Sequence, residues 1–175
     1  MDRGDDSPLY AAMLRLERRL CVVVGGGKVA LRKVERLLVS GARVRVISPR
    51  AVPALLQHAS EGRIEYVARE YQRGDAALGF LIVAATDHPE VNRQIAEEAE
   101  ENERFVNVVD DPLRCSFMVP ATYHRSGLQV AISTEGQDPI GAKRLKDTLA
   151  ADFLHGTRFF QEETEKWWRQ VRDPR

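Results

Sequence analysis

Apolar runs alternate with amphipathic stretches along the first two thirds of the chain. The runs at 20–24, 44–47, 80–85 and 105–109 predict buried strands, and a weaker one at 64–67 predicts an edge strand. Helical periodicity between them predicts helices from Lys28 to about Gly41, over 52–59 and from Pro89, the last with its outer face charged over 97–103. We therefore predict an α/β fold with a Rossmann-like parallel sheet covered by helices.

The pattern changes after Pro112. Apolar segments at 117–119 and 128–132 flank a polar turn and predict an antiparallel strand pair. Two helices are expected beyond it. The inward residues of the first are expected to be Ile140, Leu145, Leu149 and Phe153, and the second carries Phe160, Trp167, Trp168 and Val171 at helical spacing.

These changes predict three parts. Residues 1–112 form the Rossmann domain, 113–150 a small α+β dimerisation and active-site module, and 151–175 a C-terminal helical segment. The aromatic stripe of the last helix is large for so little remaining chain, and a second copy of the chain would cover it. We therefore expect a homodimer built mainly from residues beyond Pro112.

Composition narrows the class of protein. Hydrophobic residues make up 43% and charged residues 30%, which excludes overall disorder, and 26 basic residues balance 26 acidic ones. Zero net charge argues against nucleic acid or an anionic membrane surface as partner. No apolar run approaches the roughly 20 residues that span a bilayer, and the acidic N-terminus lacks a secretory pattern, so a cytoplasmic location is expected. The two cysteines, Cys21 and Cys115, are expected to be buried thiols, and no metal site is predicted.

A glycine turn follows the first predicted strand. Gly25-Gly26-Gly27-Lys28-Val29-Ala30 fits G-x-G-x-x-[GA], between a strand and a helix as that motif requires. The first glycine permits a tight turn, the second lets the backbone approach a pyrophosphate, and the small Ala30 permits close helix–strand packing. The helix N-terminus adds N–H donors and a positive dipole. The sequence therefore predicts a dinucleotide site.

The end of the second predicted strand departs from this pattern. An Asp or Glu there normally binds the adenine ribose, but this chain has Ser48-Pro49-Arg50. Ser48 offers a neutral hydrogen bond to the ribose. Arg50 is either a partner for the 2′-phosphate of NADP or solvated surface, and the sequence leaves both open.

Four segments together resemble one family, precorrin-2 dehydrogenase, the NAD-dependent module of siroheme synthases. The segments are 24–33 around the glycine turn, Ala84-Ala85-Thr86-Asp87, Asn107-Val108-Val109-Asp110-Asp111-Pro112 and Val130-Ala131-Ile132-Ser133-Thr134. The resemblance covers about residues 8–150 in the family's order. A methyltransferase does not fit in 175 residues, so we expect the stand-alone form.

The resemblance implies an enzyme that oxidises precorrin-2 to sirohydrochlorin with NAD as cofactor. In some members the same site also inserts Fe²⁺, an activity that this sequence leaves open. The implied catalytic residue is Asp110, and the implied hydroxyl groups near the substrate are Ser133 and Thr134. The implied cofactor contacts are Gly25, Gly26, Gly27, Lys28, Val29, Ser48, Pro49, Arg50, Ala85 and Thr86. The alternative function is a regulatory Rossmann module that binds NAD without turnover.

The chemistry of Asp110 agrees with that role. It follows a predicted parallel strand, at the sheet edge where open α/β sheets bind ligands. Oxidation of a reduced tetrapyrrole releases a proton as well as a hydride, and an ionised carboxylate can accept that proton. In the alternative interpretation, Asp110 caps the turn before Pro112; we assign that turn role to Asp111.

Two acidic residues depart from the family pattern. Glu135 replaces a glycine and Asp138 replaces a serine, although the substrate itself carries eight carboxylates. Cationic side chains must then supply recognition, and Arg114 and Lys143 are the predicted substrate-binding residues. The other available cations are Arg125, Arg144 and Lys146.

Overall fold

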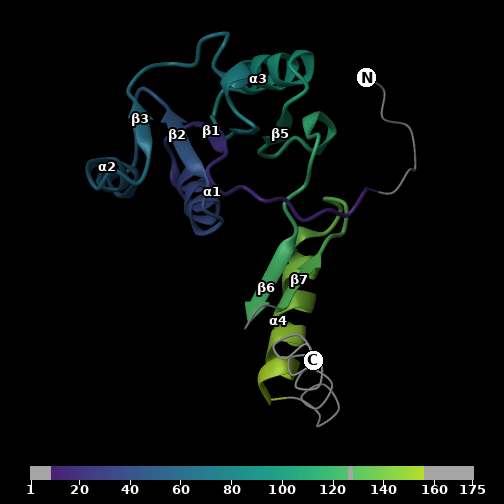
Figure 1. Cartoon of the computed structure of the whole chain (residues 1–175). Helices are drawn as coiled ribbons and strands as arrows, with labels where there is room; N and C mark the ends of the chain where they lie inside the picture. Colours follow the sequence, from purple (N-terminus) through teal and green to yellow (C-terminus); the bar gives the residue numbers. More distant parts are fainter. Residues whose placement is uncertain (1–8, 126–127, 156–175) are drawn as a thin grey trace, which may run out of the picture. The chain divides into compact units, whose positions relative to one another are not determined.

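The computed structural model describes residues 9–125 and 128–155 (Figure 1). It forms two compact units that divide between Met118 and Val119, a few residues beyond the boundary expected near Pro112. Each unit is described by itself. Within the described ranges, no helix is both long enough and apolar enough to cross a bilayer.

The first unit is a doubly wound sheet. Its elements are β1 (Leu20–Val24), α1 (Lys28–Val39), β2 (Arg43–Ile47), α2 (Pro53–Ser60), β3 (Glu65–Val67), η1 (Ala76–Leu78), β4 (Leu81–Ala84), α3 (Pro89–Glu101), β5 (Phe105–Val108) and η2 (Pro112–Arg114). The strand order is β3-β2-β1-β4-β5 and every pairing is parallel. The predicted Rossmann-like α/β class is confirmed.

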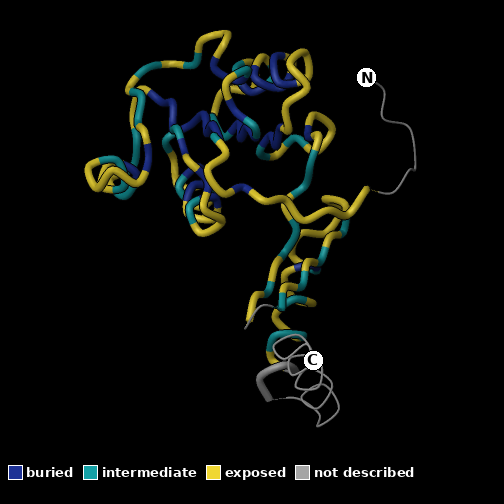
Figure 2. Tube along the Cα trace, in the orientation of Figure 1, coloured by how far each residue is buried: buried dark blue, intermediate teal, exposed yellow. Residues whose placement is uncertain are grey.

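The two faces of this sheet form separate cores. In β1, Cys21 and Val23 belong to the cluster that includes the buried side of α1, while Val22 and Val24 belong to the cluster that includes α3. The helices therefore cover opposite faces; β4 is buried along its whole length and β1 from Cys21 onward (Figures 1 and 2). Continuous apolar strands are the sequence signature of such double coverage.

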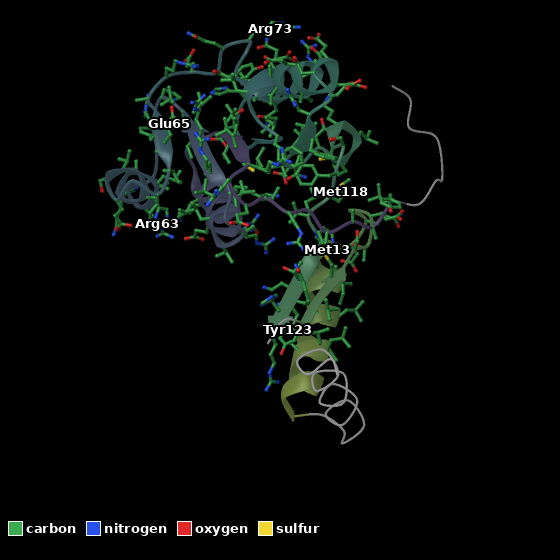
Figure 3. The ribbon with its side chains drawn as sticks, viewed as in Figure 1. Met13, Arg63, Glu65, Arg73, Met118 and Tyr123 are labelled. Atoms are coloured by element: carbon green, nitrogen blue, oxygen red, sulfur yellow. The ribbon has the colours of Figure 1, made fainter. Side chains whose placement is uncertain are left out.

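Glu98 corrects the prediction that the charge run over 97–103 forms the outer face of α3. It is only 2% exposed, and its carboxylate accepts hydrogen bonds of 2.9 Å from the backbone N–H groups of Gly74 and Ala77. The Tyr71 hydroxyl also donates to it, and burial together with this bond raises the pKa of Tyr71. Arg73, on the same loop, pairs with Glu101 of α3 (Figure 3). Glu98 thus anchors the loop before η1 to α3.

The predicted strand at 117–119 is wrong. The second unit begins its hairpin with β6 (Ala121–Arg125), which pairs in antiparallel register with β7 (Leu128–Ile132). Phe117 and Met118 instead pack against the two cores of the first unit, one on each cluster. Their apolar character therefore reflects side-chain burial without strand pairing.

The predicted inward face of the following helix is also partly wrong. In α4 (Pro139–His155), Ile140 is 67% and Leu145 is 56% exposed, whereas Ala142 is buried and Leu149 half-buried. The hairpin has only two strands, so it covers a narrow stripe of the helix. The side chain of Phe153 and the predicted helix with Trp167 and Trp168 lie outside the described residues.

An ion pair between the half-buried Arg69 and the buried Asp75 makes the stability of the first unit depend on pH. The Arg69 guanidinium donates two 2.7 Å hydrogen bonds to Asp75, and the backbone N–H of Gln72 donates a third of 2.9 Å. The Arg69 hydrogen bond is the main reason that the pKa of Asp75 lies below its usual value of 3.8. A lowered folded-state pKa stabilises the fold above the unfolded-state value, and this contribution is lost as pH falls.

We therefore expect Asp75→Asn to lower the free energy of unfolding at neutral pH. Its difference from wild type should shrink below pH 3.8, as the wild-type carboxyl becomes protonated. Denaturant titrations at several pH values measure this, with Glu90→Gln as the control because Glu90 forms an exposed pair with Arg93. A pH-independent difference would contradict the role given to this ion pair.

Candidate functional site

The glycine turn lies at the carboxyl end of β1, where the strand order changes direction between β1 and β4. Gly25 has φ +126°, and its N–H donates to the Ile47 carbonyl of β2 at 2.9 Å. A Cβ at this position would lie 2.2 Å from the Ala85 carbonyl oxygen that follows β4. Conformation and space both demand glycine here.

The other two glycines differ from each other. A Cβ on Gly26 would lie 1.9 Å from the Arg50 carbonyl oxygen, whereas one on Gly27 would meet nothing within 4 Å. Gly27 is also the N-cap of α1, and no side chain of the described chain caps this helix. The turn is therefore closed toward β2 and β4 and open at the helix N-terminus, a cradle that fits a dinucleotide pyrophosphate.

Several of the residues expected to contact the cofactor flank this cradle, and their role toward a cofactor stays a prediction. Lys28 and Val29 are exposed in the first turn of α1, while Ala30 is fully buried beneath them. Pro49 and Arg50 are exposed after β2. The backbone contacts of Gly25 and Gly26 thus bring three strand ends together around one opening.

Ser48 stabilises the loop that follows β2 at this opening. It is buried, and its hydroxyl donates to the Arg50 carbonyl at 2.7 Å. The Tyr66 hydroxyl in turn donates to the Ser48 carbonyl at 2.8 Å. The Ser48 proton is used within the loop, so only acceptor capacity is left for a ribose hydroxyl. The exposed Arg50 is the charged side chain of this segment.

Asn92 contributes to the candidate site by holding the loop after β4, a role that the sequence analysis did not identify. Its side-chain oxygen accepts from the Thr86 N–H at 3.2 Å and from the Thr86 hydroxyl at 2.7 Å, and its amide donates to the Thr86 carbonyl at 3.0 Å. Asn92 is buried on α3 beside Val91 of the apolar stripe, and this position is the signal that could have found it. It fixes the loop that follows β4.

Asp110 lies beyond β5, next to that loop. The Val109 N–H donates to the Ala84 carbonyl at 2.9 Å, which holds the start of the 109–114 loop at the end of β4. Asp110 itself has φ +62° and is exposed. Its carboxylate forms no hydrogen bond or ion pair with residues 9–125 or 128–155. A left-handed residue with a free carboxylate at this edge is a candidate catalytic group.

Asp111 is engaged differently. Its carboxylate pairs with Arg114 Nε at 2.9 Å, and it occupies the N-cap position immediately before η2. Arg114, predicted to bind substrate, is therefore already paired. It also lines a hollow of about 600 Å³ with Glu97, Glu100 and Arg104. The lining of this hollow includes no residue of the glycine turn.

The remaining predicted site residues belong to the second unit. The Ser133 hydroxyl accepts from the Glu135 N–H and the Thr134 hydroxyl accepts from the Asp138 N–H, both at 3.1 Å. Asp138 in turn accepts from the Gly141 N–H at 2.8 Å as a cap of α4. Lys143 is exposed on that helix. Their roles toward substrate stay predictions.

Glu135 shows the consequence of its departure from the family pattern. It stands where the family has glycine, and it has φ +54°. A glutamate in the left-handed region is uncommon and strained, whereas glycine adopts it freely. The turn therefore keeps the backbone conformation that the family's glycine favours.

Comparisons with known proteins show the family to which the chain belongs. Residues 12–121 match the family described as "Putative NAD(P)-binding". The siroheme synthase of Actinobacillus pleuropneumoniae serotype 3 (strain JL03) is 38% identical over 78% of this chain and 28% of its own length. Siroheme synthase 1 of Aeromonas salmonicida (strain A449) is 43% identical over 78% of this chain and 29% of its own.

A solved structure extends the similarity. SirC, precorrin-2 dehydrogenase, has a TM-score of 0.77 and 28% sequence identity, covering 93% of this chain and 79% of its own. These findings confirm the resemblance inferred from sequence and the expected nicotinamide cofactor, NAD. The chain spans less than a third of the length of the two siroheme synthases. With its matching fold and glycine cradle, the chain belongs to the NAD(P)-binding family whose pattern it matches over residues 12–121.

Proposed function

We propose that this chain is a precorrin-2 dehydrogenase, a cytoplasmic enzyme that oxidises precorrin-2 to sirohydrochlorin with NAD⁺. The observation that carries the proposal is Asp110, whose carboxylate has no hydrogen-bond or ion-pair partner among the described residues and whose backbone is left-handed, beside the strand end that adjoins the glycine cradle. The similarity to siroheme synthases and to a precorrin-2 dehydrogenase supports the substrate class. The proposal covers the oxidation alone and leaves iron insertion aside.

The reaction removes two hydrogens from the macrocycle, one as a hydride and one as a proton. NAD⁺, when bound, supplies the hydride acceptor. Asp110 accepts the proton, because it is exposed and its oxygens carry no competing hydrogen bond from the described residues. Gly27 and the α1 N-terminus hold the pyrophosphate. Thr86, which is held in place by Asn92, lines the opening between this cradle and Asp110.

We propose NAD⁺ as the cofactor, and Arg50 is the residue through which NADP⁺ would be accepted, because no carboxylate directly follows β2. The Ser48 oxygen keeps acceptor capacity toward a ribose hydroxyl, and Arg50 is exposed. If Arg50 bound a 2′-phosphate, Arg50→Ala would weaken NADP⁺ binding selectively. Calorimetry with both nucleotides distinguishes the two cases.

The test of the proposed function is direct. The protein is mixed with enzymatically prepared precorrin-2 and NAD⁺, and the appearance of sirohydrochlorin and NADH is followed by absorbance. Equal formation of both products supports the dehydrogenase. NAD⁺ binding without any product would instead support the regulatory module, the function that the missing ribose acid favours.

We also propose that the chain is a homodimer joined through its second unit. The hairpin of β6 and β7 covers only one stripe of α4, and Ile140 and Leu145 leave apolar surface exposed on that helix. A second copy of the same unit is the partner we assign, since an isologous contact buries both patches at once.

Light scattering is expected to give the mass of a dimer at micromolar concentration. Ile140→Glu places a charge on the exposed patch and should shift the mass toward that of a monomer. A wild-type monomer at that concentration would contradict the proposal. An Ile140→Glu variant that stays fully dimeric would remove this patch from the interface.

A further inference from the structure

A polar network joins α1 to β5 behind the candidate site. The Lys33 ammonium donates a 2.8 Å hydrogen bond to the Asn107 side-chain oxygen, linking two elements 74 residues apart in sequence. Lys33 is on the helix that begins at the glycine cradle, and Asn107 is on the strand that leads to Asp110. The site described above uses neither side chain.

Asn107 also forms hydrogen bonds to residues that follow the 109–114 loop. It is 6% exposed, and its amide group donates to the Phe117 carbonyl at 3.3 Å and to the Cys115 sulfur at 3.4 Å. The Cys115 sulfur also accepts from the Val108 N–H at 3.2 Å and contacts the Asp111 carbonyl at 3.3 Å. Both ends of the loop that carries Asp110 are therefore held by one network.

The position of Lys33 is electrostatically unfavourable for an ammonium group. Lys33 is half-buried, and this burial is the first cause that lowers its pKa, followed by the charges of Arg32 and Arg36 on the same helix. From the other elements, Cys115 and Asp110 act in the opposite direction. Lysine is rarely buried without a specific partner. The hydrogen bond from the half-buried Lys33 to Asn107 therefore indicates that this side chain has a function here.

We propose that Lys33 and Asn107 are positioning residues for Asp110. Through the Asn107–Cys115 hydrogen bond they fasten the end of the 109–114 loop to α1, the helix whose N-terminus forms the cofactor cradle, and so fix the place of the carboxylate relative to that cradle. The catalytic consequence rests on the proposed function. The structural link does not, and it can be measured without substrate.

Hydrogen exchange of backbone amides tests the link in the free protein. Lys33→Met removes the donor and keeps an apolar stem of similar length, and we expect exchange within 109–116 to rise at least about tenfold. Exchange in β1 and NAD⁺ affinity should stay within about twofold of wild type, because neither depends on this bond. Asn107→Leu removes this acceptor together with the amide hydrogen bonds to Cys115 and Phe117, and it should give at least the same local rise. Arg36→Met is the matched control, since it removes an exposed charge from the same helix.

Two outcomes of this experiment would overturn the proposal. One is exchange within 109–116 that stays within about twofold of wild type in Lys33→Met. The other is an equal rise in 109–116 and in β1, which would show a general loss of stability and no specific tie to the loop.

Turnover with precorrin-2 tests the catalytic consequence. Lys33→Met should lower kcat about 10- to 100-fold with an unchanged NAD⁺ Kd, because displacement of a catalytic group weakens the chemical step. In an Asp110→Asn background, Lys33→Met should cause no further loss, since it acts through that carboxylate. Losses that multiply would overturn the positioning role. If the wild type does not oxidise precorrin-2, the proposed function fails, and hydrogen exchange alone decides this inference.

Discussion

A Gly27→Val variant is expected to lose NAD⁺ binding while remaining folded. A side chain here enters open space, since a Cβ meets nothing within 4 Å, and the backbone is already in the extended region that valine prefers. Valine is a poorer N-cap than glycine, which should cost about 1 kcal/mol of stability. The same side chain fills the volume through which a pyrophosphate reaches the α1 N-terminus, so NAD⁺ affinity should fall by at least about 100-fold, or 2.7 kcal/mol.

The neighbouring glycine provides the matched comparison. Gly26→Val should damage the fold itself, because its Cβ would lie 1.9 Å from the Arg50 carbonyl oxygen. Calorimetric titration with NAD⁺ and thermal unfolding of both variants separate the two effects. Unchanged affinity in a folded Gly27→Val protein would remove the glycine turn from the cofactor site.

The order of elements in the first unit could be read from the sequence for a physical reason. Strands buried on both faces must be continuously apolar, and the Gly25–Gly27 turn marks where the first strand gives way to a helix. The same argument gave a wrong strand at Phe117, because in the sequence an apolar side chain that packs on a core cannot be told from an apolar side chain in a strand. Tertiary contacts decided between the two.

Buried polar groups were harder to predict. Glu98 follows Ile95 by three residues and so shares the buried face of α3, yet its partners are backbone N–H groups of a distant loop. Lys33 lies three residues after the buried Ala30, and its partner Asn107 is on another strand. Spacing flags such positions, but the long-range hydrogen bonds that give them a role appear only in the folded structure.

The site motif was predictable in position and not in conformation. The sequence places Asp110 at a strand end. Its positive φ depends on the conformation of the 109–114 loop, and so does the absence of a hydrogen-bond or ion-pair partner for its carboxylate among the described residues. Those two features separate it from Asp111, which has the same charge and pairs with Arg114 at 2.9 Å. This difference makes the two aspartates a natural pair for experiment.

Asp110→Asn is expected to abolish most of the turnover while leaving the protein intact. Asparagine tolerates the left-handed region as well as aspartate does, so the φ of +62° can be kept. The amide cannot accept a proton at neutral pH, and loss of a general base typically costs 10²–10⁴-fold in rate, about 3–5 kcal/mol of barrier. NAD⁺ affinity should be nearly unchanged, because the cradle uses Gly27 and backbone N–H groups of α1.

The control for this prediction is Asp111→Asn. It removes the same charge one residue away and breaks the pair with Arg114, so it tests the loop without touching the proposed proton acceptor. Steady-state oxidation of precorrin-2 should fall at least about 100-fold in Asp110→Asn and far less in Asp111→Asn. Equal losses, or more than about a third of wild-type turnover in Asp110→Asn, would show that the proton acceptor lies elsewhere. Asp110 would then be a structural residue of the loop, and the strained backbone would need another explanation.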